Sequence, residues 1–337
     1  MARFIRNHWI LIAFLFLLVL LSMPLFHFGL FYWDLSRDPA EIGYFKRNPV
    51  PEVGICLNDL AESRWEEERT IWLREAETRR LPVQIRVAHH SVERQIRQIR
   101  RFIGQNVKVL VLVPVSRTGL ADVLKEAAQN GIKVILYDEM TDGPADFYCG
   151  IDYLEAGRVQ ADALADLAGP GNYLLLRGPS DSYKAELIAQ GQQQALRAAS
   201  KSRFRLLPAI TLPQWSAEEA VLKTRVFTLH QKVKAILAPN DLVAQEIGRY
   251  FQSQKVDAPF LAGIGTEASF DQRISSEPDL MTVAADYRLL ARTAMDIAGQ
   301  YVKGKPVAGN GIIHYGSQKT SAWLLQDYPV RRSQMAN

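Results

Sequence analysis

Polar residues stand directly after the apolar runs of this sequence that have the composition of β-strands. Carboxylate and amide groups can bind the hydroxyl groups of a small polar ligand, and an aromatic ring can cover its apolar face. The same residue types also cap helices and form turns, so each one taken alone is better explained as a cap. Because they all follow predicted strands, ligand binding and helix capping are about equally well supported as explanations. The positions are Asn58-Asp59, Pro114-Val115-Ser116, Asp138-Glu139, Asp152-Tyr153, Asn240-Asp241 and Gly265-Thr266.

The elements that must position these residues are strands and helices in alternation from Glu52 onward. The alternation predicts right-handed βαβ units, mainly parallel sheets and therefore an α/β fold. Two such units leave a cleft between them, and open α/β sheets bind ligands outside the carboxyl ends of their strands. The predicted strands are 52–57, 83–87, 107–113, 133–137, 147–151, 172–176, 204–210, 235–238 and 260–263. The predicted helices are 63–79, 91–104, 119–130, 184–200, 217–229 and 241–254.

The composition is that of a folded protein with enough residues for two lobes. The 337 residues are 48% hydrophobic and carry a net charge of +4. Basic residues are scattered, and the Arg-rich stretch Arg94–Arg101 is typical of a solvated helix face. No zinc-finger spacing or other nucleic-acid motif accompanies it, so the sequence predicts no nucleic-acid partner.

Neither a metal centre nor a cofactor is predicted. Cys56 and Cys149 lie in apolar strand-like runs, which favours two buried thiols and leaves a disulfide in an oxidising compartment as the alternative. His89-His90 lacks further residues at ligand spacing. Gly169-Pro170-Gly171 is a turn without the Gly-Lys-Ser/Thr of a phosphate loop. Because no catalytic constellation is visible, we predict that the protein is not an enzyme.

An apolar segment from Trp9 to Tyr32 precedes the α/β part. It can cross a hydrocarbon core of ~30 Å, which takes roughly 20 helical residues. Arg3 and Arg6 precede it, so the positive-inside rule places residues 1–8 in the cytoplasm and the chain after Asp34 outside. We therefore predict a single transmembrane signal anchor over 9–32, followed by a linker over 33–51.

The alternative for this segment is a cleaved signal peptide, which would release the protein to the periplasm. The apolar run is long for a signal peptide, and mostly bulky residues occupy Met23–Phe28, where cleavage would be expected. No small-x-small pattern follows, and no cysteine lies nearby to carry a lipid. The uncleaved anchor is the preferred prediction.

Several segments after the linker resemble the type I periplasmic sugar-binding proteins, and among them the xylose-type branch. The resemblance extends from about Glu52 to Arg331. Its more specific features are the Arg64-Trp65 pair and the strand ending Tyr137-Asp138. The segments that carry it are Val53–Leu60, Glu62–Trp65, Val107–Pro114, Gly131–Asp138, Asp146–Tyr148, Gly171–Tyr173, Ala238–Asp241 and Met281–Val283.

The resemblance implies a clamshell of two Rossmann-like lobes, joined by three crossovers and closing on a monosaccharide. It assigns 52–152 and 267–308 to the N-terminal lobe, and 153–266 and 309–331 to the C-terminal lobe. It implies a small-molecule ligand, a pentose or related sugar, with Trp65 as a stacking ring and Asp138 holding two hydroxyls. Together with the strand-end residues, it gives the predicted ligand-binding set Asn58, Arg64, Trp65, Ser116, Asp138, Asp152, Asn240 and Asp241.

Five positions depart from the family pattern. Glu139 stands where the family usually has an Arg, Gly265 where it has a carboxylate, and Ala285 where it has a cationic or amide contact. The remaining two are Tyr153, in place of an asparagine, and Thr211, in place of an aromatic residue, with Trp215 nearby. Losing two or three charge-assisted hydrogen bonds, at ~1.5–3 kcal/mol each, predicts either a ligand other than xylose or weak sugar binding.

Two functions are compatible with an anchored binding domain. The first is sensing for a membrane partner such as a histidine kinase, because tethering raises the effective concentration for a neighbour in the same membrane. The resemblance supports it, since anchored xylose-type proteins work with such kinases. The alternative is the receptor of an ABC sugar importer, which would dock on a permease. The anchor and the missing helix-turn-helix exclude a repressor of the same fold.

Overall fold

A computed structural model describes residues 42–44, 50–60, 63–198, 203–213, 215–265, 274, 277–326 and 328–332. Contacts divide the chain into Met1–Ile42 and Gly43–Asn337. The predicted anchor, 9–32, lies outside the described residues. Within the part that is described, no helix is long and apolar enough to cross a membrane. A short strand, β1 (Ile42–Tyr44), precedes the α/β part.

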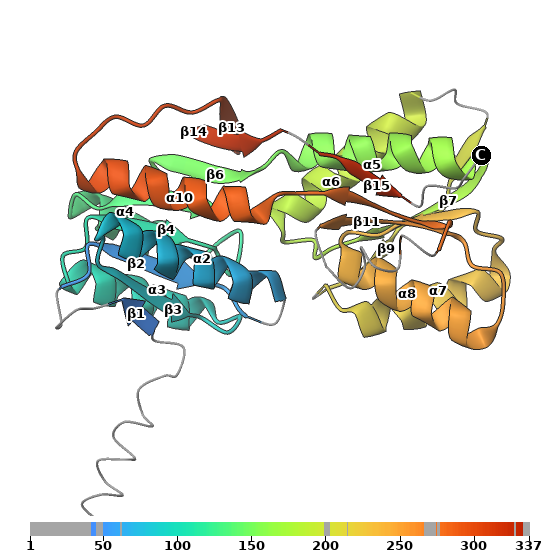
Figure 1. The fold of residues 1–337 in the computed structure, drawn as a ribbon, viewed down its shortest axis with the longest axis horizontal. Helices are drawn as coiled ribbons and strands as arrows, with labels where there is room; N and C mark the ends of the chain where they lie inside the picture. The colour runs from blue at the N-terminus through green and yellow to red at the C-terminus, as the bar shows by residue number, and fades with distance from the viewer. Residues whose placement is uncertain are drawn as a thin grey trace, which may run out of the picture. The chain divides into compact units, whose positions relative to one another are not determined.

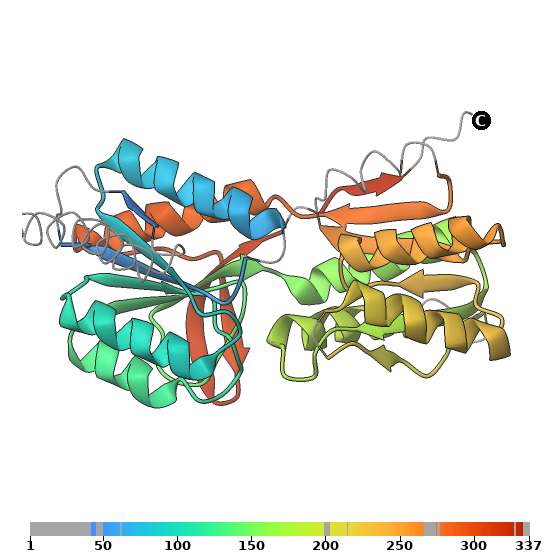
Figure 2. The same cartoon turned by 90° about the horizontal axis from the view of Figure 1, so that it is seen from below.

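The first lobe is built on a sheet with the strand order β3-β2-β4-β5-β6-β14-β13. All neighbours in it run parallel except β13 and β14, which form a hairpin. The central strands are uninterrupted apolar runs because helices cover both faces, α2 with α10 on one and α3 with α4 on the other (Figure 2). The strands are β2 (Val53–Leu57), β3 (Val83–Val87), β4 (Val109–Leu112), β5 (Lys133–Tyr137), β6 (Phe147–Ile151), β13 (Gly311–Tyr315) and β14 (Gln318–Leu325). The helices are α2 (Ser63–Arg79), α3 (Val92–Gly104), α4 (Ala121–Gln129) and α10 (Tyr287–Val302).

The second lobe repeats this architecture on a sheet with the order β15-β12-β11-β10-β7-β8. Only β15 runs antiparallel to its neighbour, and β9 pairs with the end of β7. The buried residues of its core come from β7, β10 and β11 and from the inner faces of α7 and α8. The strands are β7 (Gly171–Arg177), β8 (Phe204–Leu206), β9 (Ile210–Thr211), β10 (Ala235–Leu237), β11 (Phe260–Gly265), β12 (Leu280–Ala284) and β15 (Val330–Arg332). The helices are α5 (Tyr153–Ala168), α6 (Tyr183–Ala198), α7 (Ala217–His230) and α8 (Asp241–Gln254).

The chain passes between the lobes three times, and two of the predicted boundaries move. The first passage, from β6 to α5, lies at the predicted position. The second follows β12, because Leu280–Ala284 pairs with β11 and so extends the second lobe to residue 284 instead of 266. The third follows β14, because the β13–β14 hairpin adds to β6 and so extends the first lobe to Leu325. Figure 1 shows the red hairpin beside the green β6, and the orange α10 next to α2 of the first lobe.

The two cysteines are buried free thiols, as the sequence predicts. Cys56 lies in β2 and Cys149 in β6, and β4 and β5 stand between these strands in the sheet. The alternative of a disulfide between them is therefore wrong. Burial raises the pKa of both thiols, which keeps them protonated and unreactive.

Close packing of α5 against α6 depends on two glycines. A Cβ added at Gly157 would lie 2.3 Å from the carbonyl oxygen of Ile188, and one at Gly191 would lie 2.0 Å from that of Leu154. Both obstacles are backbone atoms, so a side chain could fit only if the helices moved apart. This contact fixes α6, whose first turn reaches the other lobe.

Replacing Gly191 with alanine is expected to destabilise the protein by about 1–3 kcal/mol, the usual effect of overpacking. Urea denaturation followed by circular dichroism measures it as a lower midpoint. Gly104→Ala is the matched control, because a Cβ added at this exposed helical glycine would have no atom within 4 Å. Alanine there is expected to be neutral or stabilising by about 0.5–1 kcal/mol. Equal midpoints for the two variants would contradict the packing argument.

Candidate functional site

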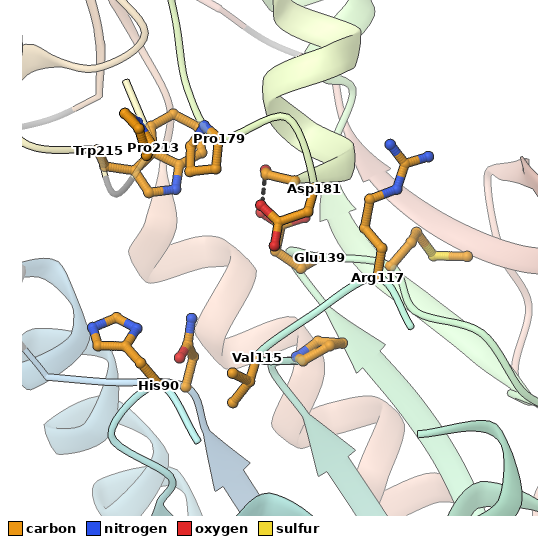
Figure 3. Close-up of a pocket in the computed structure, with 12 residues that line it drawn as sticks. His90, Val115, Arg117, Glu139, Pro179, Asp181, Pro213 and Trp215 are labelled. Carbon is orange, nitrogen blue, oxygen red and sulfur yellow. Dashed lines mark hydrogen bonds between the residues drawn. The ribbon is translucent and has the colours of Figure 1, made fainter. Parts of the chain in front are cut away.

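A cavity of about 350 Å³ is lined by residues of both lobes, at the carboxyl ends of β2, β4, β5 and β7. Figure 3 shows Trp215, Pro213 and Pro179 of the second lobe grouped on one side of it, with His90 and Val115 of the first lobe across from them. The volume suits a small ligand, since such sites start at roughly 300 Å³. The other lining residues are Asn58, Pro114, Arg117, Glu139, Met140, Asp181 and Ser182.

Asp138, at the end of β5, is the centre of a buried charged cluster. It is fully buried, and its backbone φ of 65° is in the left-handed region. Arg64 Nη2 lies 3.0 Å from its Oδ2 and Lys184 Nζ 3.3 Å from the same atom, while the Tyr153 hydroxyl donates to Oδ1. Burial alone would raise the pKa of Asp138, but the Arg64 and Lys184 charges hold it below its usual range. Both carboxylate oxygens are thus occupied by protein groups.

A second buried carboxylate, Glu68, shares Arg64 with Asp138. Arg64 Nε donates to Glu68 Oε1 at 2.8 Å, and the Tyr137 hydroxyl donates to Oε2. Burial raises the pKa of Glu68 to about 7 despite the attraction of Arg64. Arg64 also lies over two aromatic rings, 4.2 Å from the centre of Trp65 and 3.7 Å from that of Tyr287. One guanidinium therefore serves two carboxylates.

Among the described residues, the hydrogen-bond donors to Glu139 are neutral groups, unlike those to Asp138. The Ser182 hydroxyl donates to Oε1 at 2.6 Å and the Lys184 amide to Oε2 at 3.4 Å. Its side chain is partly exposed toward the cavity, as Figure 3 shows. Burial raises the pKa of Glu139, with the Lys184 charge acting in the opposite direction.

The first turn of α6 joins the two lobes across the cleft. Besides the Ser182–Glu139 and Lys184–Asp138 contacts, the Tyr183 hydroxyl donates to the His314 carbonyl at 3.1 Å. Glu186, later in the same helical turn, also contacts the first lobe, since its Oε2 lies 2.8 Å from Arg117 Nη1. We call the segment Ser182–Glu186 the α6 tip. Its contacts connect the two lobes.

A second, much smaller cavity lies beside the charged cluster. Its volume is about 30 Å³, which is enough for about one water. Trp215 lines both cavities, so they share one wall. The smaller cavity is lined by Arg64, Tyr153, Lys184, Ile188, Trp215, Pro239, Asn240, Ile264 and Tyr287. Of these two cavities, the larger one has room for a monosaccharide.

Three of the sequence-predicted site residues are engaged in local caps or turns. Ser116 accepts from the Thr118 amide at 3.3 Å. Asp152 caps α5 through the Glu155 amide at 3.1 Å, and Asn240 caps α8 through the Val243 amide at 2.9 Å, while also lining the small cavity. The contacts of these three residues are therefore those of helix caps and turns, as the alternative explanation predicts.

Of the other five predicted residues, one lines the larger cavity and the rest are buried in contacts with other side chains. Arg64 and Asp138 meet in the charged cluster, and Asp241 is buried with its carboxylate 2.5 Å from the Thr282 hydroxyl. Asn58 lines the larger cavity, and its buried Oδ1 has no hydrogen-bond partner among the described residues. Trp65 is 7% exposed and packs on Tyr137 instead of lining either cavity.

Of the residues that line the larger cavity, only Asn58 belongs to the predicted set, and the polar and aromatic ones that the set lacks include Trp215, Arg117, Ser182 and Glu139. Trp215 has a positive φ of 58°, and its ring lies against Gly178, where a Cβ would come within 2.4 Å. The sequence signal for this ring was the departure at Thr211, with Trp215 nearby. Trp215 lines the cavity, whereas Trp65 does not.

The absence of a carboxylate at Gly265 has a steric explanation. Its φ is +153°, and a Cβ there would lie 2.9 Å from Asp241 Oδ2. An acidic side chain would also bring a second negative charge against Asp241. Position 265 is therefore restricted to glycine by its neighbour.

Comparisons with known proteins identify relatives of the whole α/β part. A family model described as a periplasmic binding protein domain matches residues 54–306. The D-xylose-binding periplasmic protein of Escherichia coli K12 is 29% identical over 287 residues, covering 84% of this chain and 87% of that one. A multiple sugar-binding periplasmic receptor of Rhizobium radiobacter is 24% identical over 279 residues, covering 75% and 78%.

Solved structures share the fold. A carbohydrate transporter solute-binding protein from Chloroflexus aurantiacus, in complex with D-glucose, superposes with a TM-score of 0.75 at 24% identity, covering 83% of this chain and 92% of that one. The Caulobacter myo-inositol-binding protein superposes with a TM-score of 0.71 at 21% identity, covering 83% and 94%. Two parallel-sheet lobes, three crossovers and an interlobe cavity thus accompany the sequence match, and the chain belongs to the periplasmic binding protein domain family.

Proposed function

We propose that this protein binds a sugar or a related polyol outside the cytoplasm, in the cavity between its lobes. The observation that carries the proposal is the 350 Å³ cavity at the carboxyl ends of the strands, lined by both lobes. Asn58 offers it an unpartnered amide oxygen, Glu139 a carboxylate and Trp215 a ring. These are the groups that hold hydroxyls and cover the apolar face of a sugar ring. The relatives named for D-xylose and for multiple sugars support the ligand class.

Attachment to the membrane and sensing form the second part of the proposal. The apolar run Trp9–Tyr32, preceded by Arg3 and Arg6, supports a single anchor with the lobes outside the cytoplasm. In that form the protein reports ligand to a membrane partner such as a histidine kinase, because closure around the ligand changes the surface offered to a neighbour. The second candidate is the receptor of an ABC importer, which the transporter relative from Chloroflexus aurantiacus favours.

A ligand screen on the full-length chain in mild detergent tests the binding proposal. Thermal unfolding is measured with pentoses, hexoses, inositols and linear polyols, and at least one is expected to raise Tm in a concentration-dependent way. Asn58→Ala should weaken that ligand by roughly 3- to 10-fold, the effect of one lost neutral hydrogen bond. Asn130→Ala, an exposed asparagine beyond α4, is the matched control and should leave affinity unchanged. A panel without any shift would contradict the proposal.

A further inference from the structure

Among the residues that the structure describes, the ionisable groups beside the cavity do not balance in charge. Three carboxylates, Glu68, Asp138 and Glu139, lie within one cluster with two cations, Arg64 and Lys184. Arg64 contacts Glu68 and Asp138 at 2.8 and 3.0 Å, and Lys184 contacts Asp138 at 3.3 Å. With all five groups ionised, one negative charge is left without a partner.

The uncompensated charge belongs to Glu139. Among the described residues no cationic side chain forms an ion pair with its carboxylate, whose donors are the Ser182 hydroxyl and the Lys184 amide. The raised pKa of Glu139 reflects the cost of burying its charge, which the Lys184 charge offsets only in part. Of the three carboxylates only Glu139 lines the larger cavity, so only it can meet a ligand there.

The other charged residues of the lining do not supply the missing cation. Arg117 is turned to Glu186, at 2.8 Å, and to the hydroxyl of Tyr315, at 3.3 Å. His90 Nε2 lies 2.9 Å from Asp59 Oδ2, so a positive imidazole would already have its counter-ion. The remaining charged residue, Asp181, is a second acid. The lining is therefore negative and rich in acceptors, including the unpartnered Asn58 Oδ1.

We propose that the ligand of this cavity is positively charged, an amino sugar or another amine-bearing polyol, and that Glu139 binds its ammonium group. The inference rests on the proposed binding function and narrows its ligand class. An ammonium group offers three donors, which Glu139 and Asn58 can accept, and it supplies the charge that the cluster lacks. Trp215 can cover the apolar face of the sugar ring.

Calorimetric titration of the full-length chain with matched sugars tests the inference. The probes are D-glucose, 2-amino-2-deoxy-D-glucose and its N-acetyl derivative, with the corresponding galactose and mannose sets, at a pH at which the amines are protonated. In at least one set the amino sugar is expected to bind roughly 10- to 100-fold tighter than the parent sugar, the effect of a charge-assisted hydrogen bond. The N-acetyl derivative adds bulk without charge and should show no such gain.

The variant Glu139→Gln tests whether Glu139 causes the tighter binding of the amino sugar. The glutamine keeps the size of the side chain and an oxygen for the Ser182 hydroxyl, so the advantage of the amino sugar should fall to within about 3-fold. Glu126→Gln, an exposed carboxylate on α4, removes the same net charge and should leave the advantage intact. An unchanged advantage in Glu139→Gln would overturn the role of Glu139.

The outcomes separate this inference from the function on which it rests. If parent sugars bind as tightly as the amino sugars or more tightly, the charged-ligand inference is wrong and the sugar-binding proposal stands. If no sugar of either kind binds, both are wrong. Tighter binding of an amino sugar that disappears in Glu139→Gln supports both.

Discussion

Replacing Asp138 with asparagine is expected to destabilise the protein by about 3–5 kcal/mol, the usual effect of removing one partner from a buried ion pair. Asparagine has nearly the same shape and can still accept from the Tyr153 hydroxyl. It leaves Arg64 and Lys184 without the carboxylate on which both converge, at 3.0 and 3.3 Å. Urea denaturation at neutral pH measures the loss.

Two comparisons make this expectation specific. Glu139→Gln, at the next position, removes a carboxylate without an ion pair and should change stability by less than about 1 kcal/mol. Adding Lys184→Met to Asp138→Asn should recover part of the loss, because one uncompensated charge disappears with its partner. Equal losses in the two single variants would show that Asp138 is not the centre of the cluster.

The effect of Asp138 should also depend on pH, with a defined sign. Because the folded protein holds the pKa of Asp138 below its usual value of 3.8, the carboxylate stabilises the fold at neutral pH. That contribution is lost as the pH falls through the pKa in the folded state. The difference in unfolding free energy between wild type and Asp138→Asn should therefore shrink on acidification.

Helices with large apolar residues on one face could be predicted from the sequence, whereas a helix that buries mainly small residues could not. The helices 63–79 and 241–254 match α2 and α8 residue for residue. No helix was predicted at α5, because its buried face, although it has helical spacing, consists mainly of Ala, Gly and Gln and gives only a weak apolar pattern. The lobe boundaries failed for another reason: the assignment of β12 and β14 depends on pairing with β11 and β6, which are distant in sequence.

The candidate site shows the same limit at the level of side chains. Strand ends can be located from local patterns: Asn58 lines the larger cavity, whereas Asp138 is buried in the charged cluster. Whether a side chain faces a cavity or a helix end depends on neighbours from other elements. Asp138 is enclosed by residues of α2, α5 and α6, and no local pattern predicts their convergence. For the same reason the sequence could not show that Trp215 lines the cavity and that Trp65 does not.

The α6 tip connects the charged cluster with the motion that ligand binding requires. A ligand of the interlobe cavity can enter only if the lobes separate, and binding then shifts the equilibrium toward closure. Lys184 reaches from the second lobe to the fully buried Asp138 of the first and so holds the two lobes together. The ammonium group of Lys184 thus makes a contact between the lobes that a ligand would otherwise have to make.

Lys184→Met is therefore expected to open the unliganded protein. Methionine keeps the length of the side chain but removes the contact with Asp138 Oδ2. The Asp138 carboxylate still has Arg64 at Oδ2 and the Tyr153 hydroxyl at Oδ1. Losing a charge-assisted hydrogen bond of about 1.5–3 kcal/mol should lower the ratio of closed to open molecules roughly 10- to 100-fold. Pulsed electron paramagnetic resonance measures the change between spin labels at two exposed positions, Lys125 of α4 and Leu229 of α7. Both native cysteines are buried, so thiol labels can be attached without removing them.

Glu186→Gln is the matched control for this opening, because it breaks another ion pair of the α6 tip. The Arg117–Glu186 pair is partly exposed to solvent, with 28% and 39% of the side chains accessible, and such pairs contribute only about 0–1 kcal/mol. Its distance distribution should stay close to that of the wild type, whereas Lys184→Met should shift to longer distances. A distribution for Lys184→Met that matches the control would mean that the apolar and neutral contacts of the tip, such as Tyr183 on the His314 carbonyl, suffice to hold the lobes closed.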